Sequence, residues 1–243
     1  MGRNTILKEN PSVKTFKWKN EKFDKKTKTV TRETGWYYWD KTIGENGEEV
    51  RLEDDIRFIW LESMQSVSGF SKKEEIGIYS NEVPGTPDGL KEYGKQELVV
   101  KIGTNIIAKG SWKEISEEVK GHGGKYTLAV YRNIMNKNGE WEIVRFLFSG
   151  SSREPWMKIS DRQKLLNNAV IISNEYEEVE MKTGETYQSP ILQLASLTNE
   201  EKEEADKSYP KVKDFFNFQF NENLEHKKEK YEEIEEEIPD PEY

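Results

Sequence analysis

One short helical segment inside a strand-rich chain is the feature that most limits the folds open to this sequence. Residues 111–120 begin with a capping box formed by Ser111 and Glu114, and the segments before them have the pattern of strands. Residues 125–148 follow the helix at once and have the pattern of a hairpin, with two long apolar runs around an Asn-Lys-Asn-Gly turn. This order predicts a mainly β fold in which one helix interrupts a set of strands.

The five-stranded barrel called the OB-fold has a helix between its third and fourth strands, and we expect that architecture here. A generic β-sandwich is the alternative. The expected barrel strands are, in order, residues 13–19 or 36–40, 56–61, 98–109, 125–133 and 141–148. Residues 63–96, rich in Gly, Pro and Ser, are interpreted as a long loop with a short strand near 76–79. An extra helix and an extra hairpin between residues 151 and 195 are interpreted as elaborations.

The composition excludes several kinds of chemistry. The 243 residues include no Cys and two His, so we expect no disulfide, no thiolate nucleophile and no metal site built on sulfur or clustered imidazoles. The acidic cluster at residues 53–55 is interpreted as a solvated turn instead of a Mg²⁺ site. The motifs of nucleotide-binding and hydrolytic enzymes are missing, and the glycine-rich residues 121–124 are interpreted as a turn after the helix. We therefore expect a non-enzyme without cofactor or metal.

Membrane targeting is not expected from the sequence. The chain has no apolar run of the length that crosses a bilayer, and residues 1–8 lack the apolar stretch of a signal peptide. We expect a soluble cytoplasmic protein with no membrane partner.

The charge of the chain is distributed unevenly. Residues 198–243 contain 7 Lys and Arg against 16 Asp and Glu, a net charge of −9, which equals the net charge of the whole chain. Within the neutral remainder, residues 1–41 and 101–165 have basic excesses of +6 and +5. A neutral body with basic regions beside an acidic end is typical of an interaction tail with nucleic acid as one candidate partner. A solvated helix that frays into a disordered end is the alternative, and charge alone favours that interpretation.

Aromatic residues stand beside Lys or Arg at several places, as in Phe16-Lys17-Trp18-Lys19. Single-stranded nucleic acid needs this combination, because rings stack on bases while cations follow the phosphates. Phe58, Trp60, Trp112, Phe146 and Phe148 are interpreted as core. The candidate stacking residues are Trp18, Trp36, Tyr38 and Tyr131. The candidate phosphate-binding residues are Lys14, Lys17, Lys19, Lys125, Arg132 and Arg145.

The strand–helix–hairpin arrangement of residues 97–148 is combined with an acidic end, residues 232–243, whose last residue is aromatic. In these features the chain resembles phage and prophage single-stranded-DNA-binding proteins, which join an OB-fold to an acidic C-terminal tail. The resemblance implies a protein of DNA replication or recombination, in the host cytoplasm, that binds single strands without sequence specificity. The tail would contact other replication or recombination proteins through Glu235, Glu236, Glu237, Asp240, Glu242 and Tyr243. RNA is the alternative ligand, and the oligomeric state stays open.

The expected organisation divides the chain into four parts. These are a disordered lead-in, a nucleic-acid-binding domain, a charged helical extension and a disordered acidic tail, at residues 1–11, 12–197, 198–230 and 231–243. The rival function is that of a non-enzymatic phage interaction or assembly protein. In that case a Phe-rich segment would bind a partner through Phe215, Phe216, Phe218 and Phe220.

Overall fold

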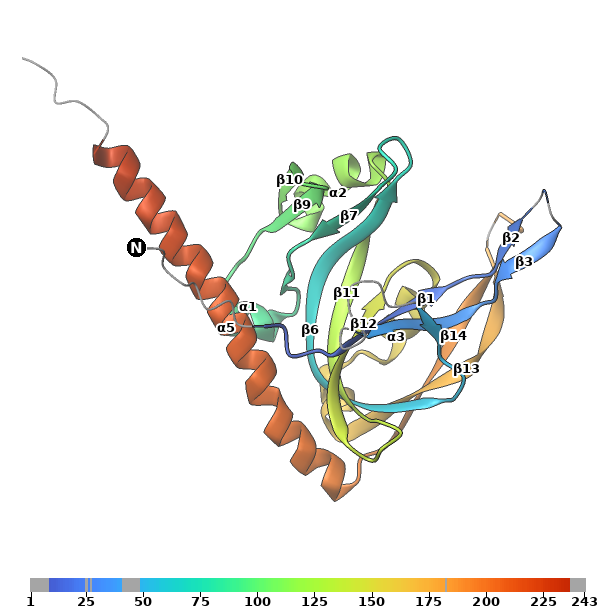
Figure 1. The fold of residues 1–243 in the computed structure, drawn as a ribbon. Helices are drawn as coiled ribbons and strands as arrows, with labels where there is room; N and C mark the ends of the chain where they lie inside the picture. Colours follow the sequence, from blue (N-terminus) through green and yellow to red (C-terminus); the bar gives the residue numbers. More distant parts are fainter. Residues whose placement is uncertain (1–8, 25, 27, 41–48, 182, 237–243) are drawn as a thin grey trace, which may run out of the picture.

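The computed structural model describes residues 9–24, 26, 28–40, 49–181 and 183–236, with side chains in the last helix described as far as Phe220. The chain is mainly β, as predicted (Figure 1). The strands are β1 (Lys14–Lys19), β2 (Lys22–Asp24), β3 (Thr29–Arg32), β4 (Gly35–Asp40), β5 (Val50–Arg51), β6 (Ile56–Ser71), β7 (Ile76–Ser80), β8 (Val83–Pro84), β9 (Leu98–Ile102), β10 (Asn105–Gly110), β11 (Gly124–Met135), β12 (Trp141–Phe148), β13 (Asn168–Glu180) and β14 (Thr186–Ser196). The helices are α1 (Pro87–Tyr93), α2 (Trp112–Gly121), α3 (Arg153–Ile159), α4 (Arg162–Asn167) and α5 (Asn199–Glu236), with a 3₁₀ turn, η2 (Gly150–Ser152).

The central sheet is open, so the expected closed five-stranded barrel is wrong. Its strand order is β10-β9-β7-β6-β11-β12-β1-β4-β5, with β1 parallel to β12. The long strand β6 explains the difference: β11 pairs with one of its edges, while β13, β8 and β7 pair in turn along the other. The sheet therefore branches at β6 instead of closing on itself. Residues 63–71, expected to be loop, belong to this strand.

The α2 helix and the hairpin after it form as predicted. The backbone N–H of Ser111 donates to Glu114 Oε2 at 2.8 Å, which completes the expected capping box at the start of α2. Strands β11 and β12 then pair in antiparallel register from Leu128 opposite Phe148 to Met135 opposite Trp141. Local signals thus determine both elements.

The curled sheet encloses an aromatic core, which α3 and α4 also contact. Phe16 stacks on Phe146 with ring centroids 4.4 Å apart, and Phe148 stacks on Trp156 at 4.9 Å. The core also contains a buried cation, because the Arg132 guanidinium lies 3.7 Å from the centroid of the Phe58 ring. Burial lowers the pKa of Arg132 well below its usual value. Arg132 is therefore a core residue, and its assignment as a phosphate contact is wrong.

Helix α5 covers part of the opposite face of the sheet. It begins with a capping box in which Glu201 N donates to Thr198 Oγ1 at 3.2 Å. Arg57 of β6 also bonds to this end of the helix, because its Nε donates to Glu201 Oε1 at 2.5 Å. Phe215, Phe216 and Phe220 are buried against the sheet and α1, in a second core. This part of the expected charged extension therefore belongs to the main packed unit. No helix in the described part of the chain is both long enough and apolar enough to cross a membrane.

Candidate nucleic-acid interface

The pairing of β1 with β4 decides which aromatic residues face outward. Phe16 lies opposite Tyr38 and Trp18 opposite Trp36; Phe16 and Trp36 are buried in the aromatic core, and the partly buried Trp18 and Tyr38 pack against it. Trp36 is only 2% exposed. The assignment of Trp36 as a base-stacking residue is therefore wrong, because its neighbours already cover it. Tyr38 is partly buried on the same side and packs on Phe16.

The outer face of the same strands takes part in a large groove. Lys17 and Trp39 line it from β1 and β4, and both alternate with the core residues along their strands. The groove has a volume of about 1410 Å³ and runs across β6, β11 and β12 to the turn between β6 and β7. From the other strands it receives side chains that include Ser66, Ser68, Lys125, Thr127, Arg145 and Leu147.

Cations dominate the lining of this groove. Glu82 is the single carboxylate among the described residues that line it. The cations are Lys17, Lys19, Arg32, Lys72, Lys73, Lys120, Lys125 and Arg145. Lys72 and Lys73 are exposed in the β6–β7 turn, and Glu74 and Glu75 of the same turn do not line the groove. The groove is thus an anion-attracting surface in a chain with a negative net charge.

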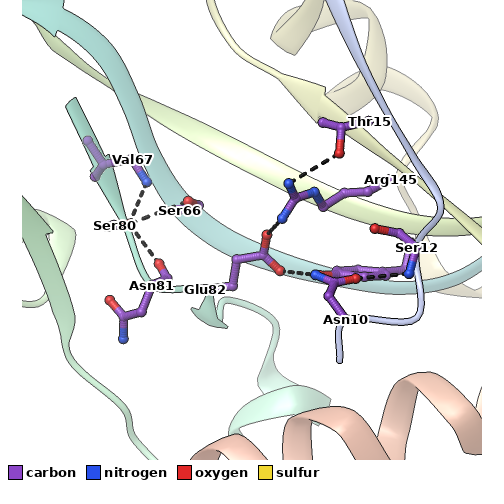
Figure 2. Close-up of polar contacts among 10 residues, drawn as sticks. Asn10, Ser12, Thr15, Ser66, Val67, Ser80, Asn81, Glu82 and Arg145 are labelled. Carbon is purple, nitrogen blue, oxygen red and sulfur yellow. Dashed lines mark hydrogen bonds and ion pairs between the residues drawn. The ribbon is translucent and has the colours of Figure 1, made fainter. Parts of the chain in front are cut away.

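A hydrogen-bonded network closes the floor of the groove, and Figure 2 shows most of its members. Arg145 Nη1 donates to Glu82 Oε1 at 2.6 Å, and the Tyr131 hydroxyl donates to Glu82 Oε2 at 2.6 Å. Asn10 Nδ2 donates to the same hydroxyl at 2.8 Å, while Arg145 Nη2 donates to Thr15 Oγ1 at 3.2 Å. Glu82 thus neutralises Arg145 and holds it in place.

Tyr131 belongs to this network as a buried residue. Its ring is 0% exposed and packs edge-on against Phe216 of α5 at 5.2 Å. Burial, together with the charge of Glu82, raises the pKa of Tyr131 well above its usual value. The hydroxyl therefore stays protonated and is the donor in its hydrogen bond to Glu82. The assignment of Tyr131 as a base-stacking residue is therefore wrong.

The surroundings of Lys17 disfavour its charged form. Burial lowers its pKa from the usual value, the positive charges of Arg145 and Lys19 lower it further, and the negative charge of Glu49 opposes them. Lys19 is less available because it forms an ion pair with Glu49. A phosphate placed beside Lys17 would relieve the repulsion between these cations. This part of the groove therefore gains from an anionic ligand.

A smaller section, of about 560 Å³, continues the groove. The two sections share Lys19, Arg32, Lys125 and Ser149, so they form one path over the surface. Trp18 lines the smaller section and is held there by its Nε1 donor, which lies 2.9 Å from Asn20 Oδ1 and 3.2 Å from the Gln188 carbonyl oxygen.

Three rings in the larger section are open to solvent. Trp39, Phe70 and Tyr79 are 39%, 55% and 50% exposed. The Tyr79 hydroxyl donates to the Gly103 carbonyl at 2.5 Å, which fixes its ring at the edge of the groove. Exposed aromatic rings beside cations are the surface on which single-stranded bases stack.

The structure brings together about half of the predicted binding residues. Lys17, Lys19, Lys125 and Arg145 line the larger section, and Trp18 lines the smaller one. Lys14 does not join them, because its Nζ lies 2.5 Å from Glu142 Oε1 and 3.8 Å from Asp40 Oδ2. Of the predicted tail residues, Glu235 and Glu236 fall in α5 without described side chains, and Glu237, Asp240, Glu242 and Tyr243 lie outside the described residues.

The sequence reasoning missed several groove residues, and some of them carried a signal. The residues missed are Arg32, Lys72, Lys73, Lys120, Trp39, Phe70 and Tyr79. The pair Lys72-Lys73 lies in the segment interpreted from the sequence as a long loop. Two adjacent lysines between two apolar runs could have indicated a basic hairpin turn. Within the glycine-rich residues 121–124, His122 and Gly123 form the predicted turn between α2 and β11. Gly123 has φ +95°, and a Cβ on Gly69 would lie 2.4 Å from its carbonyl oxygen, so β6 passes very close to this turn.

Comparison of the chain with protein-family models, with curated proteins and with solved structures gave no match.

Proposed function

We propose that this chain is a non-enzymatic protein that binds single-stranded DNA in the two-section groove. The observation that carries the proposal is the lining of the larger section, where eight cations and three exposed rings surround one carboxylate, and that carboxylate is already bonded to Arg145. Phosphates supply the anion that such a surface attracts, and bases supply the flat faces that stack on its rings.

Single strands fit this surface better than duplex. Trp39, Phe70 and Tyr79 offer ring faces to unpaired bases, whereas the bases of a duplex are stacked on one another and inaccessible to them. The groove offers no long helix that would enter a major groove, and its cations follow a curved surface of strands and turns. Binding without sequence preference is expected, because every base has a face that stacks.

The strength of the electrostatic contribution follows from the cations that are open to a ligand. Lys19 and Arg145 already have carboxylate partners. If the other six lining cations each contact one phosphate, the slope of log K against log salt is about −4, at roughly −0.7 per contact. Binding should therefore weaken strongly between low and physiological salt.

The acidic end of the chain supplies the second part of the proposal. Residues 231–243 contain seven Asp and Glu and no Lys or Arg. A segment of this charge competes with DNA for a basic groove, or binds basic surfaces of replication and recombination proteins when DNA displaces it. A role in the DNA replication or recombination of a phage, which the resemblance to phage single-stranded-DNA-binding proteins implies, is part of the same proposal.

The arrangement of the Phe-rich segment favours the groove over the assembly alternative. Phe218 is half-buried, while Phe215, Phe216 and Phe220 are at most 5% exposed because they pack on the sheet and α1 of this same chain. A partner would have to displace α5 to reach them. The groove, in contrast, is open as it stands.

Titration of the full chain with fluorescein-labelled oligo-dT, followed by anisotropy, tests the proposal. Duplex DNA and single-stranded RNA of equal length are the comparison ligands. Binding of oligo-dT that is tighter than binding of duplex, and that weakens with salt, is the expected result. Absence of binding at low salt, or preference for duplex, would remove the proposal.

A further inference from the structure

A second basic element projects from the body beside the groove. Strands β2 and β3 form a separate two-stranded sheet that does not pair with the main one. Figure 1 shows this ribbon extending away from the sheet on the side opposite α5. Its length is about 13 Å for a four-residue strand at 3.3 Å per residue.

The ribbon is strongly charged for its size. Residues 22–32 contain five Lys and Arg and one Asp. Lys22, Lys26 and Lys28 have exposed side chains, and so does the apolar Val30, at 48%. A two-stranded ribbon outside the main sheet is by itself only marginally stable in water, and repulsion among its lysines lowers its stability further. Fold stability therefore does not explain this concentration of charge.

The root of the ribbon lies where the two sections of the groove meet. Arg32, at the end of β3, lines both sections. Its Nε and Nη2 donate to the carbonyl oxygen of Asn20 at 3.1 and 3.0 Å, which ties the two ends of the ribbon together. The backbone N–H of Glu21 donates to Thr34 Oγ1 at 2.8 Å and closes the same root. The ribbon is thus anchored at the groove while its lysines extend beyond it.

We propose that the β2–β3 ribbon is a second binding site, for the sugar–phosphate backbone of a single strand that continues out of the groove. The inference rests on the proposed function, because the ligand is the same strand. The groove holds bases on its rings, and the ribbon adds phosphate contacts to the next nucleotides. A longer strand therefore binds more tightly than one that fills the groove alone.

The test compares two variants with the same change in charge. In the first, Lys22→Gln, Lys26→Gln and Lys28→Gln neutralise the ribbon. In the control, Lys202→Gln, Lys207→Gln and Lys211→Gln remove three exposed lysines of α5 that line neither section of the groove. Wild type and both variants are titrated with an oligo-dT series of increasing length at several salt concentrations, and circular dichroism checks that each is folded.

The ribbon variant should reach its maximal affinity at a shorter oligonucleotide than wild type does. For long oligonucleotides its affinity at low salt should be about tenfold lower, and its salt slope less steep by about 2, at roughly 0.7 for each lost phosphate contact. If wild type binds oligo-dT and the ribbon variant matches the α5 control at every length, the ribbon is not a binding site while the proposed function stands. If wild type binds no oligo-dT at all, both proposals are overturned.

Discussion

Two halves of one sheet face differ in what covers them. Along β6, β11 and β12, the half under α5 presents mostly apolar side chains, namely Met64, Ala129, Tyr131 and Ile143. Further along the same strands, the same face presents Ser66, Ser68, Lys125, Thr127, Arg145 and Leu147 and forms the groove. The backbone is continuous between the two halves, so only the type of side chain changes.

This difference decides what can cover each half favourably. The apolar half is stabilised by removing its surface from water, and α5 does this with Phe215, Phe216 and Phe220. The basic half gains nothing from such a cover, because burying unpaired cations is costly. An anionic ligand suits it instead. Tyr131 marks the boundary, since its ring packs on Phe216 while its hydroxyl donates to Glu82 in the groove floor.

The largest expected effect is on stability, from a substitution in the covered half, which is the apolar half under α5. Replacing Phe216, which is 0% exposed, by Ala should lower the free energy of unfolding by about 3–5 kcal/mol, because it leaves a cavity between α5 and the sheet. Replacing the exposed Lys73 of the groove by Gln should change it by less than about 0.5 kcal/mol. Urea denaturation of both variants measures the contrast. Equal stabilities would mean that α5 is not part of the packed unit.

The covered half should also make stability depend on pH through Glu62. Burial raises the pKa of Glu62 to about 7, with Glu92 and Asp88 raising it and Arg162 lowering it. The folded state therefore holds a proton that the unfolded state releases near pH 4.5, so stability falls as pH rises from about 4.5 to 7 and then levels off. Between pH 5 and 8 the free energy of unfolding of the wild type should fall by on the order of 2–3 kcal/mol because of Glu62. The Glu62→Gln variant should lack this decrease, and denaturation at each pH measures it. An unchanged pH profile in the variant would show that another group is responsible.

Removing an aromatic ring from the open half, which is the basic half that forms the groove, should weaken DNA binding and leave folding intact. Tyr79→Ala should weaken oligo-dT binding by about 1–3 kcal/mol, the usual effect of losing one stacked base. Tyr79→Phe is the matched control, because it keeps the ring and loses only the hydroxyl that bonds to Gly103. Trp36→Ala should instead destabilise the protein, since that ring is in the core. Unaltered binding by Tyr79→Ala would place the bases elsewhere.

Charge removal in the open half should have a smaller effect that depends on salt. The double variant Lys72→Gln, Lys73→Gln should make the salt slope less steep by about 1.4, at roughly 0.7 per phosphate contact. Its affinity should approach that of wild type at high salt, because screening weakens the contacts it lost. A loss that is the same at all salt concentrations would contradict a phosphate role for this turn.

The smallest effect is expected from the acidic end. Deleting residues 231–243 removes seven acids and changes the net charge from −9 to −2. If the tail competes for the groove, affinity for oligo-dT should rise modestly at low salt and little at high salt. The comparison is made by anisotropy at matched ionic strength. An affinity that stays the same would leave the tail with the role of binding partner proteins.

The sequence predicts those elements whose signals are local. The capping boxes at Ser111 and Thr198, and the turn between β11 and β12, need only a few neighbouring residues, and all three form as expected. The length of β6 was missed because Gly69 and several Ser residues near it resemble a loop, although β11 pairs with them throughout. A pairing partner that is distant in sequence decided this element.

The candidate site was predicted only in part for the same reason. Four consecutive aromatic residues, 36–39, place rings on both faces of β4, and the sequence does not say which face meets the core. Pairing with β1 turns Trp36 and Tyr38 inward and leaves Trp39 in the groove. Arg132 was misplaced likewise, because a buried cation among aromatic rings has no signature in a single sequence.

Photocrosslinking shows whether the groove half of this sheet face binds single-stranded DNA. Oligonucleotides that carry 5-iodouracil are irradiated with the full chain, and the crosslinked residues are identified by mass spectrometry. Crosslinks are expected at Trp39, Phe70 or Tyr79, and they should be lost when unlabelled oligo-dT is added in excess. Crosslinks that fall only outside the groove, or no crosslinks under conditions where the strand is bound, would contradict binding in the groove.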